Sequence, residues 1–317
     1  MVIGILFPIA ALVTGIVLLT LCSDKAVEHS VYFASALGIS SIMIGLVLVS
    51  IGTDLPEISN SIISCWSGHG DIDIGDSFGS VLGQITLVLG IVALLSRGFG
   101  VKKREVLVIG IFEILALILA LSVAVTGFTR VKAFLLIATW PVFIFMIRKL
   151  TAKDIIKKKA YSKKERHYLY HFAVAAAGFA GVAIGSIAVV QSVIMLSNQL
   201  GIPEYLISFF AVGIGTSLPE LMVDLTAIRK REYELAIGDI LGSCIVDSTV
   251  SISIGQLLFP TAVLVGDYQR SVLLAVYALF ASAVVTLALV TRGKVDKKAA
   301  VLFVVLYTIS YSLLYLS

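Results

Sequence analysis

The fold is decided by a short stretch, Gly52-Thr53-Asp54-Leu55-Pro56-Glu57, which places a proline and two carboxylic acids inside a long apolar run. Proline has no backbone N–H and its ring clashes with the carbonyl group four residues earlier, so the helix should break just before Pro56. A second copy, Gly215-Thr216-Ser217-Leu218-Pro219-Glu220, lies in the other half of the chain. Broken helices are tolerated in lipid only where the freed backbone groups line a cavity or bond to protein. We therefore expect the two stretches to meet near the middle of a membrane.

The composition places the chain in a lipid bilayer. Of its 317 residues, 59% are hydrophobic and 14% are charged, and the mean hydropathy is +1.04. A water-soluble domain of this size could not bury so much apolar surface. Transmembrane helices need about 20 mostly apolar residues each, and such windows predict ten spans. They are residues 3–22, 32–64, 74–96, 105–127, 131–147, 169–197, 203–228, 235–259, 270–291 and 298–316.

The basic residues predict the orientation of these spans. Cytoplasmic loops retain Lys and Arg, and if both termini lie outside the cell, almost all of the 24 Lys and Arg fall in inward loops. The exceptions are Arg130, Lys132 and Arg270. We expect a multi-pass protein of the cell (plasma) membrane in which residues 148–168 form a basic cytoplasmic linker. This linker could also bind anionic membrane lipid, whereas no feature points to nucleic acid.

An internal repeat relates the two halves. At an offset of 163 residues, Gly75-Asp76 and Gly79-Ser80 fall on Gly238-Asp239 and Gly242-Ser243, and the two proline motifs fall on each other without a gap. Each half holds five spans, and an odd number means that the second copy enters the membrane from the opposite side. We expect an all-α membrane protein whose ten transmembrane helices form two inverted five-helix repeats with broken helices 2 and 7. Residues 1–147 and 169–317 are the two halves, which should share one core.

The glutamates of the two proline motifs require a positively charged partner. A charged carboxylate near the bilayer centre costs several kcal/mol or more unless it is paired, and no Lys or Arg lies within the spans at the depth of Glu57 and Glu220. A metal cation or a proton remains as the partner. Six to eight oxygen ligands in flexible geometry suit calcium, whereas magnesium holds its water more tightly. Calcium is therefore the preferred ion.

Further oxygen donors lie on the third and eighth spans. Ser80 and Gln84 are four residues apart, as are Ser243 and Asp247, so each pair lies on one helix face. Each pair can add two oxygen atoms to a shared site.

Other polar residues of the spans leave their roles open. Asp76 and Asp239 near the expected helix starts favour capping of the N-terminal dipole, with a place on the ion path as the alternative. Asp224 follows Glu220 by one turn and could line an access route, whereas Glu113 has no repeat partner and should pack or face an interface. The histidines and cysteines show no metal-ligand or CxxC spacing and receive no role. They are His29, His69, His167, His171, Cys22, Cys65 and Cys244.

The paired motifs resemble the two alpha-repeats of the cation/calcium exchanger superfamily, and within it the prokaryotic sodium/calcium exchangers. The matching stretches are residues 52–57 with 75–84, and residues 215–220 with 238–247. The resemblance implies that one cluster binds the transported calcium and sodium ions, and that the first and sixth spans slide over the other eight helices to alternate access. The implied ligands are Glu57, Glu220, Thr53, Thr216, Ser217, Ser80, Ser243 and Asp247.

Two departures from the family pattern concern the coupling ion. Asp54 stands where the first repeat usually has serine, and Gln84 stands where asparagine is usual; we include both among the expected ion ligands. An ionised Asp54 would make four carboxylates with Glu57, Glu220 and Asp247, and like charges at close range disfavour full ionisation. Protons could therefore compete as the coupling ion. The proline motif itself resembles the sodium-coupled branch rather than the proton-coupled one.

The expected function is a secondary active antiporter that exchanges Ca²⁺ for Na⁺ by alternating access. Proton-coupled or potassium-dependent cation exchange and magnesium transport are alternatives on the same fold, and a cation channel is an alternative of another class. We expect no enzyme, because the sequence has no HExxH motif, no nucleophile with a histidine partner and no cofactor motif.

Overall fold

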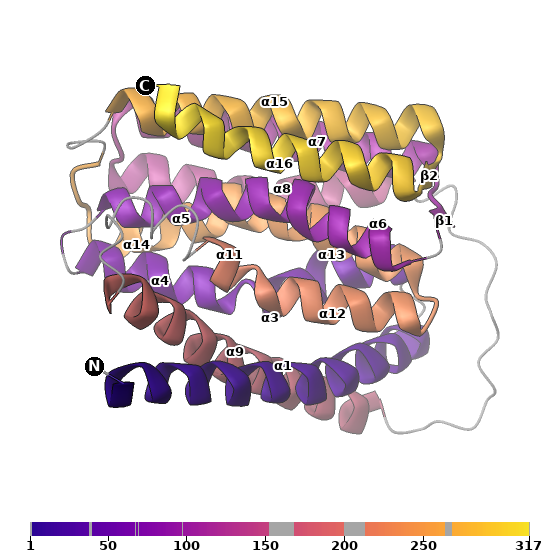
Figure 1. The fold of residues 1–317 in the computed structure, drawn as a ribbon. Helices are drawn as coiled ribbons and strands as arrows, with labels where there is room; N and C mark the ends of the chain where they lie inside the picture. Colours follow the sequence, from indigo (N-terminus) through magenta and orange to yellow (C-terminus); the bar gives the residue numbers. More distant parts are fainter. Residues whose placement is uncertain are drawn as a thin grey trace.

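The computed structural model describes residues 2–37, 40–66, 68, 70–96, 98–151, 168–199, 213–263 and 268–316, nearly all of them in helices (Figure 1). Among these residues, seven helices are long and apolar enough to cross a membrane, or up to eight if one bent pair counts as a span. The expected seventh span begins in residues 203–212, which lie outside the described part. The protein is thus a helical membrane protein, and the count of ten spans stays a prediction.

The first half of the chain contains one long helix, one broken helix, one helix with a π-helical middle, and two further long helices. Its elements are α1 (Val2–Leu37), α2 (Ser41–Ile44), η1 (Gly45–Val49), α3 (Ser50–Thr53), α4 (Leu55–Trp66), α5 (Gly70–Leu82), η2 (Gly83–Val88), α6 (Leu89–Leu95), α7 (Lys103–Thr126) and α8 (Arg130–Thr151).

The second half repeats this order within its described residues. Its elements are α9 (Tyr168–Gln199), α11 (Gly213–Thr216), α12 (Leu218–Arg229), α13 (Tyr233–Val246), η5 (Asp247–Ser251), α14 (Ile252–Leu258), α15 (Tyr268–Arg292) and α16 (Lys297–Leu316). The π-helical segments η2 and η5 follow α5 and α13 at matching places, so the repeat seen in the sequence is also a repeat of local structure.

Both proline motifs break their helices where the sequence predicts. Asp54 interrupts the chain between α3 and α4 with φ −78° and ψ 5°, and the axes on either side differ by 43°. Ser217 interrupts it between α11 and α12 with φ −80° and ψ 1°. The breaks fall two residues before Pro56 and Pro219, because each proline occupies the first turn of the following helix, where no N–H is needed.

One expected boundary is wrong. The sequence predicted a first span of residues 3–22 and a loop before residue 32, but α1 continues unbroken to Leu37. Its charged residues Asp24 and Lys25 do not end the helix: they lie on its surface, where the backbone carbonyl of Asp24 accepts a 2.8 Å hydrogen bond from Lys230. On the other side of the helix, Ala26 and Val27 are fully buried.

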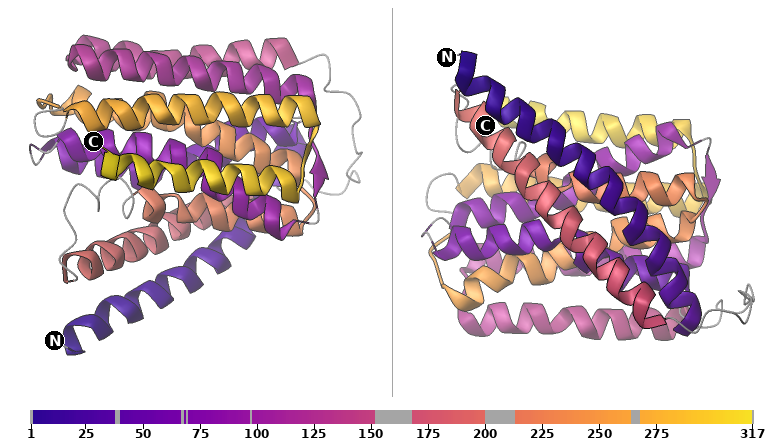
Figure 2. Two further views of the ribbon diagram at one scale, coloured as in Figure 1. Left: turned by 45° about the horizontal axis from the view of Figure 1, so that its top comes forward. Right: turned by 90° about the horizontal axis from the view of Figure 1, so that it is seen from below.

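The helices α1 and α9 lie side by side and cross the remaining helices obliquely (Figure 2). Small residues permit the close contact: a Cβ atom at Gly178 would lie 2.9 Å from the backbone nitrogen of Ala26, and one at Gly181 would collide with the Cys22 sulfur. The pair therefore forms a layer of its own beside the main core.

Glycines also bring the broken helix of the first half against α13. A Cβ atom at Gly45 would overlap the carbonyl oxygen of Leu235, and one at Gly238 would overlap that of Ile42. Backbone therefore packs on backbone here, which positions the break at Asp54 beside α13.

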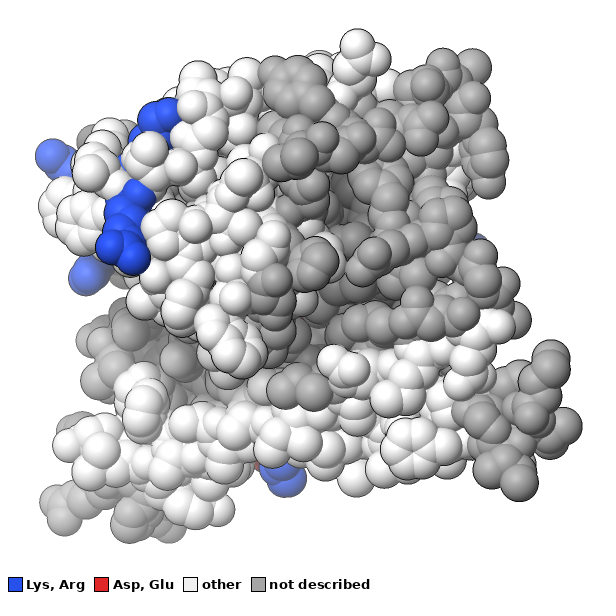
Figure 3. Space-filling model, turned by 90° about the vertical axis from the view of Figure 1, so that its left-hand side faces the viewer, with Lys and Arg blue, Asp and Glu red and all other residues white. Residues whose placement is uncertain are grey.

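The two ends of the bundle differ in charge. Both chain ends lie at the same end in Figure 1, and few of the side chains that Figure 3 describes on that face are Lys or Arg. At the opposite end, β1 (Phe99–Gly100) pairs with β2 (Lys294–Val295). Described basic residues gather around this small sheet and the adjoining helix ends; they are Lys102, Lys103, Arg104, Arg229, Lys230, Arg231, Arg292, Lys294, Lys297 and Lys298.

Candidate cation site

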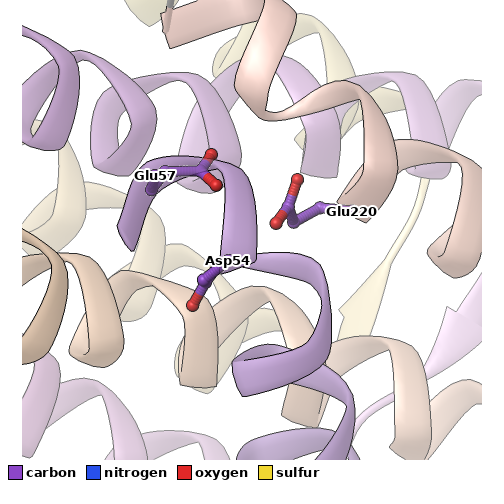
Figure 4. Close-up of side chains that lie close together, drawn as sticks. All are labelled: Asp54, Glu57 and Glu220. Atoms are coloured by element: carbon purple, nitrogen blue, oxygen red, sulfur yellow. The ribbon is translucent and has the colours of Figure 1, made fainter. Parts of the chain in front are cut away.

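Three carboxylic acids from the two proline motifs meet inside the bundle (Figure 4). One carboxylate oxygen from each of Asp54, Glu57 and Glu220 lies within 4.8 Å of the other two. The side chains are at most 1% exposed, and none of their six carboxylate oxygens accepts a hydrogen bond within the described residues. The helix breaks produce this meeting, because they turn Asp54 and the first turns of α4 and α12 toward each other.

A fourth carboxylic acid extends the cluster. Asp247, at the start of η5, is fully buried and lies close enough to interact electrostatically with Asp54, Glu57 and Glu220. Gln84 is near Asp247 and accepts a 3.4 Å hydrogen bond from the Cys244 thiol. The four acids expected from the sequence therefore share one volume.

Hydroxyl groups from both halves surround the acids. The Ser80 and Thr216 hydroxyl oxygens lie 3.1 Å apart. Thr53 donates to the backbone carbonyls of Val49 and Ser50 at 3.2 Å, and in both cases the hydroxyl oxygen keeps lone pairs for a cation.

The remaining predicted hydroxyls, of Ser217 and Ser243, are buried as well. Ser217 donates to the carbonyl of Gly213 at 2.8 Å, and its oxygen would lie 3.6 Å from a Cβ atom at Gly83. Ser243 is fully buried and its hydroxyl has no hydrogen-bond partner within the described residues. All ten residues predicted for the site are buried, and their role as ion ligands stays a prediction.

The donor set consists of oxygen atoms, and its acids carry several negative charges when they are ionised. The ion pairs seen in the described part of the chain involve other acids near the helix ends, such as Lys102 with Glu234 at 2.9 Å. Uncompensated carboxylates in a membrane interior are costly. Oxygen ligands of this kind suit hard cations, so the arrangement can neutralise itself by binding one.

The capping role preferred for Asp76 and Asp239 is wrong. The helix α5 begins at Gly70 and α13 begins at Tyr233, so both aspartates lie well beyond the first turn. Asp76 instead accepts hydrogen bonds from Asn60 at 2.5 Å and from Thr216 at 3.2 Å.

Sequence reasoning missed Asn60. Asn60 follows Glu57 by three residues and so lies on the same side of α4. This spacing could have identified it from the sequence.

The residues left without a role are also placed. Glu113 is fully buried, near Ser282 of α15, so it packs inside the protein. His29 and His171 connect α1 with α9 through ring nitrogens 3.0 Å apart, whereas His69 and His167 lie outside the described residues. The three cysteines are free thiols.

Comparisons with known proteins agree with this architecture. The family model described as sodium/calcium exchanger protein matches residues 7–149 and 170–316. The inner membrane protein YrbG of Escherichia coli is 27% identical over 283 residues, which cover 86% of this chain and 87% of the relative. The sodium/calcium exchanger MaX1 of Methanosarcina acetivorans is 25% identical over 291 residues, which cover 80% and 83%.

A solved structure shows the same fold. It is the sodium-calcium exchanger NCX_Mj soaked with Na⁺ and Sr²⁺, which matches with a TM-score of 0.80 at 25% identity. The match covers 97% of this chain and 98% of that chain.

Proposed function

The chain belongs to the sodium/calcium exchanger protein family, and we propose that it is a secondary active antiporter that exchanges Ca²⁺ for Na⁺ across the cell membrane by alternating access. The observation that carries this proposal is the meeting of Asp54, Glu57 and Glu220 within 4.8 Å, in the interior and without a counter-charge from the described residues. The relative MaX1 is named a sodium/calcium exchanger, which agrees with this choice of ions.

Glu57 and Glu220 are the central ligands in this proposal. They come from opposite halves, so a cation held by both joins the halves. Oxygen atoms of the surrounding residues complete the coordination of Ca²⁺, which takes six to eight ligands. These residues are Thr53, Thr216, Asp54, Ser217, Ser80, Ser243, Gln84 and Asp247.

The proposed membrane arrangement has ten crossings in two inverted halves. The repeated element order and the matching breaks at Asp54 and Ser217 support it. The gathering of basic residues at the end opposite the termini supports a cytoplasmic location for that end and for the linker, residues 148–168, with both termini outside. In this arrangement α1 and α9, which form a separate layer, slide across the other helices to open the site to either side.

Coupled exchange requires that the protein does not switch from one side of the membrane to the other while its ion site is empty. A site with several uncompensated carboxylates is strongly disfavoured in the closed, water-free state. Binding of Ca²⁺ or of Na⁺ removes this barrier, so each ion carries the transition in one direction. Because both ions use the same carboxylates, they compete, and the Na⁺ gradient drives Ca²⁺ out.

One specific observation favours a second candidate, proton-coupled exchange. Asp54 adds a third acid to a triad whose carboxylate oxygens accept no hydrogen bond from the described residues, and acids this close together cannot all ionise without a cation. A proton on the triad would then take the place of a sodium ion during the exchange cycle.

Measurements of ion flux identify the coupling ion. Purified protein is reconstituted in liposomes, and ⁴⁵Ca²⁺ uptake is measured with an outward gradient of Na⁺, K⁺ or H⁺ alone, and with Mg²⁺ as competitor. We expect saturable uptake only with Na⁺ inside. Uptake driven by a pH gradient alone would show that H⁺, and not Na⁺, is the coupling ion. Non-saturable flux without any counter-ion would indicate a channel.

A further inference from the structure

A second buried acid pair lies beside the central cluster. Asp224 belongs to α12 and Asp239 to α13, and both side chains are fully buried. Their carboxyl groups lie within hydrogen-bonding reach of each other. Two carboxylates form a hydrogen bond only when they share a proton, so in their ionised form they repel each other.

No close hydrogen bond from a neutral donor reaches this pair in the described part of the chain. None of the four carboxylate oxygens of Asp224 and Asp239 accepts a hydrogen bond from a donor in the described part of the chain. The Thr53 hydroxyl lies within hydrogen-bonding reach of Asp239, and its single hydrogen can instead go to the carbonyl of Val49 or of Ser50, each 3.2 Å away. When Thr53 donates to either carbonyl, its oxygen is available to a cation beside Asp239.

The matching place in the first half is built differently. Asp76 corresponds to Asp239 in the repeat, and it accepts hydrogen bonds from Asn60 and Thr216. Ser61 corresponds to Asp224, and its hydroxyl accepts a hydrogen bond from the backbone N–H of Gly255 at 3.1 Å. One half therefore satisfies its aspartate with neutral donors, whereas the other half faces it with a second acid.

We propose that Asp224 and Asp239 form a second cation site, separate from the central cluster, which binds a hard metal cation between the two carboxyl groups. A buried pair of acids without donors needs positive charge, and carboxylate and hydroxyl oxygens select hard cations. The carboxylate oxygens together with the Thr53 oxygen supply the ligands. This inference rests on the proposed function only in that the cation is one of the transported ions.

The second site lies beside the central cluster, on the side of the basic end of the bundle. Asp224 follows Glu220 by four residues, which is about 6 Å along α12, in the direction of Arg229 and the basic end of the bundle. Glu220 interacts electrostatically with both Asp224 and Asp239, and Thr53 borders both sites. The pair is therefore placed to receive a cation that leaves the central cluster toward the basic end.

Equilibrium binding tests the site without requiring transport. The number of ²²Na⁺ or ⁴⁵Ca²⁺ ions bound per molecule is measured at one fixed pH on purified full-length protein, with each ion alone. The variants are Asp224→Asn and Asp239→Asn, which keep the shape of each side chain. The matched control is Glu113→Gln, which removes a fully buried carboxylate that is not among the ligands of either site.

Each aspartate variant should bind one ion fewer than the unchanged protein, for Na⁺, Ca²⁺ or both, and Glu113→Gln should bind the full number. The measurement in which the bound ion is lost, with Na⁺ alone or with Ca²⁺ alone, identifies the cation of the second site. An unchanged number of bound ions in either aspartate variant would overturn the second site.

A variant without the two central glutamates separates the test of the second site from the test of the proposed function. In the double variant Glu57→Gln, Glu220→Gln, any ion bound at the second site should remain, and it should disappear when Asp224→Asn is added. If these central substitutions leave ion binding intact while Asp224→Asn removes an ion, the proposed function fails and the second site stands. If the double variant retains no ion at all, the second site fails as an independent site.

Discussion

The hydroxyl oxygens of Ser80 and Thr216 lie 3.1 Å apart, although the residues are 136 positions apart in the chain. This contact joins α5 of the first half to α11 of the second. Thr216 also donates to Asp76, so polar groups of one half are satisfied by the other. The halves therefore depend on each other for a buried polar interior, as a joint core requires.

Removal of one central charge should stop exchange. Glu57→Gln and Glu220→Gln each keep the side-chain shape but remove a carboxylate that the cation needs, so Ca²⁺ uptake into Na⁺-loaded liposomes should fall to background. Removing one of two paired charges in the interior costs several kcal/mol of binding, or at least a hundredfold in affinity. Glu113→Gln should retain uptake. Normal exchange in either central variant would remove that residue from the site.

Asp54, the third acid of the triad, should affect the pH dependence of Ca²⁺ uptake more than its maximal rate. Asp54→Ser restores the residue found at the matching position, Ser217, and leaves Glu57 and Glu220 in place. With one acid fewer, protons compete less with metal ions, so Ca²⁺ uptake should become less sensitive to acid pH while its maximal rate changes little. Uptake is measured across a pH series at fixed Na⁺. An identical pH profile for both proteins would exclude a proton role for Asp54.

Much of this site could be predicted from the sequence because proline and buried charge have local and severe consequences. Pro56 and Pro219 fix the helix breaks, and the repeat brings Glu57 and Glu220 together.

The extent of α1 was not predictable in the same way. The polar residues of α1 are typical of a loop in the sequence alone. The contacts of this helix with Lys230 and α9 appear only in the structure. The partners of Asp76 and Asp239 were also hidden, since a lone aspartate near an expected helix start gives no sign of what faces it across the bundle.

Packing between η1 and α13 should tolerate no added methyl group. Gly45→Ala and Gly238→Ala would each place a Cβ atom on a backbone carbonyl, of Leu235 and Ile42 respectively, and backbone cannot move aside as a flexible side chain can. We expect a loss of about 1–3 kcal/mol from overpacking, seen as a lower unfolding temperature in detergent. The control is Gly100→Ala, where the nearest atom to an added Cβ is 3.9 Å away. Equal unfolding temperatures for all three variants would contradict the close packing.

The layer of α1 and α9 should move as one unit. A Cβ atom at Gly181 would lie 3.1 Å from the Cβ of Cys22, a few tenths of an ångström short of the usual separation in a disulfide. Gly181→Cys should therefore cross-link to Cys22 under oxidation, visible as altered mobility of protease fragments, and exchange should persist. The control, Gly181→Cys with Cys22→Ser, should not cross-link. Loss of exchange on oxidation of the first variant alone would show that α1 and α9 slide past each other.

The most direct test of the account is a crystal structure of the protein grown with Ca²⁺ and without Na⁺. The account predicts one strong density peak between the two helix breaks, with carboxylate oxygens of both Glu57 and Glu220 about 2.3–2.6 Å from it. Carboxyl groups of these two residues that point apart, or a Ca²⁺ ion bound elsewhere with this cluster filled only by water, would contradict it.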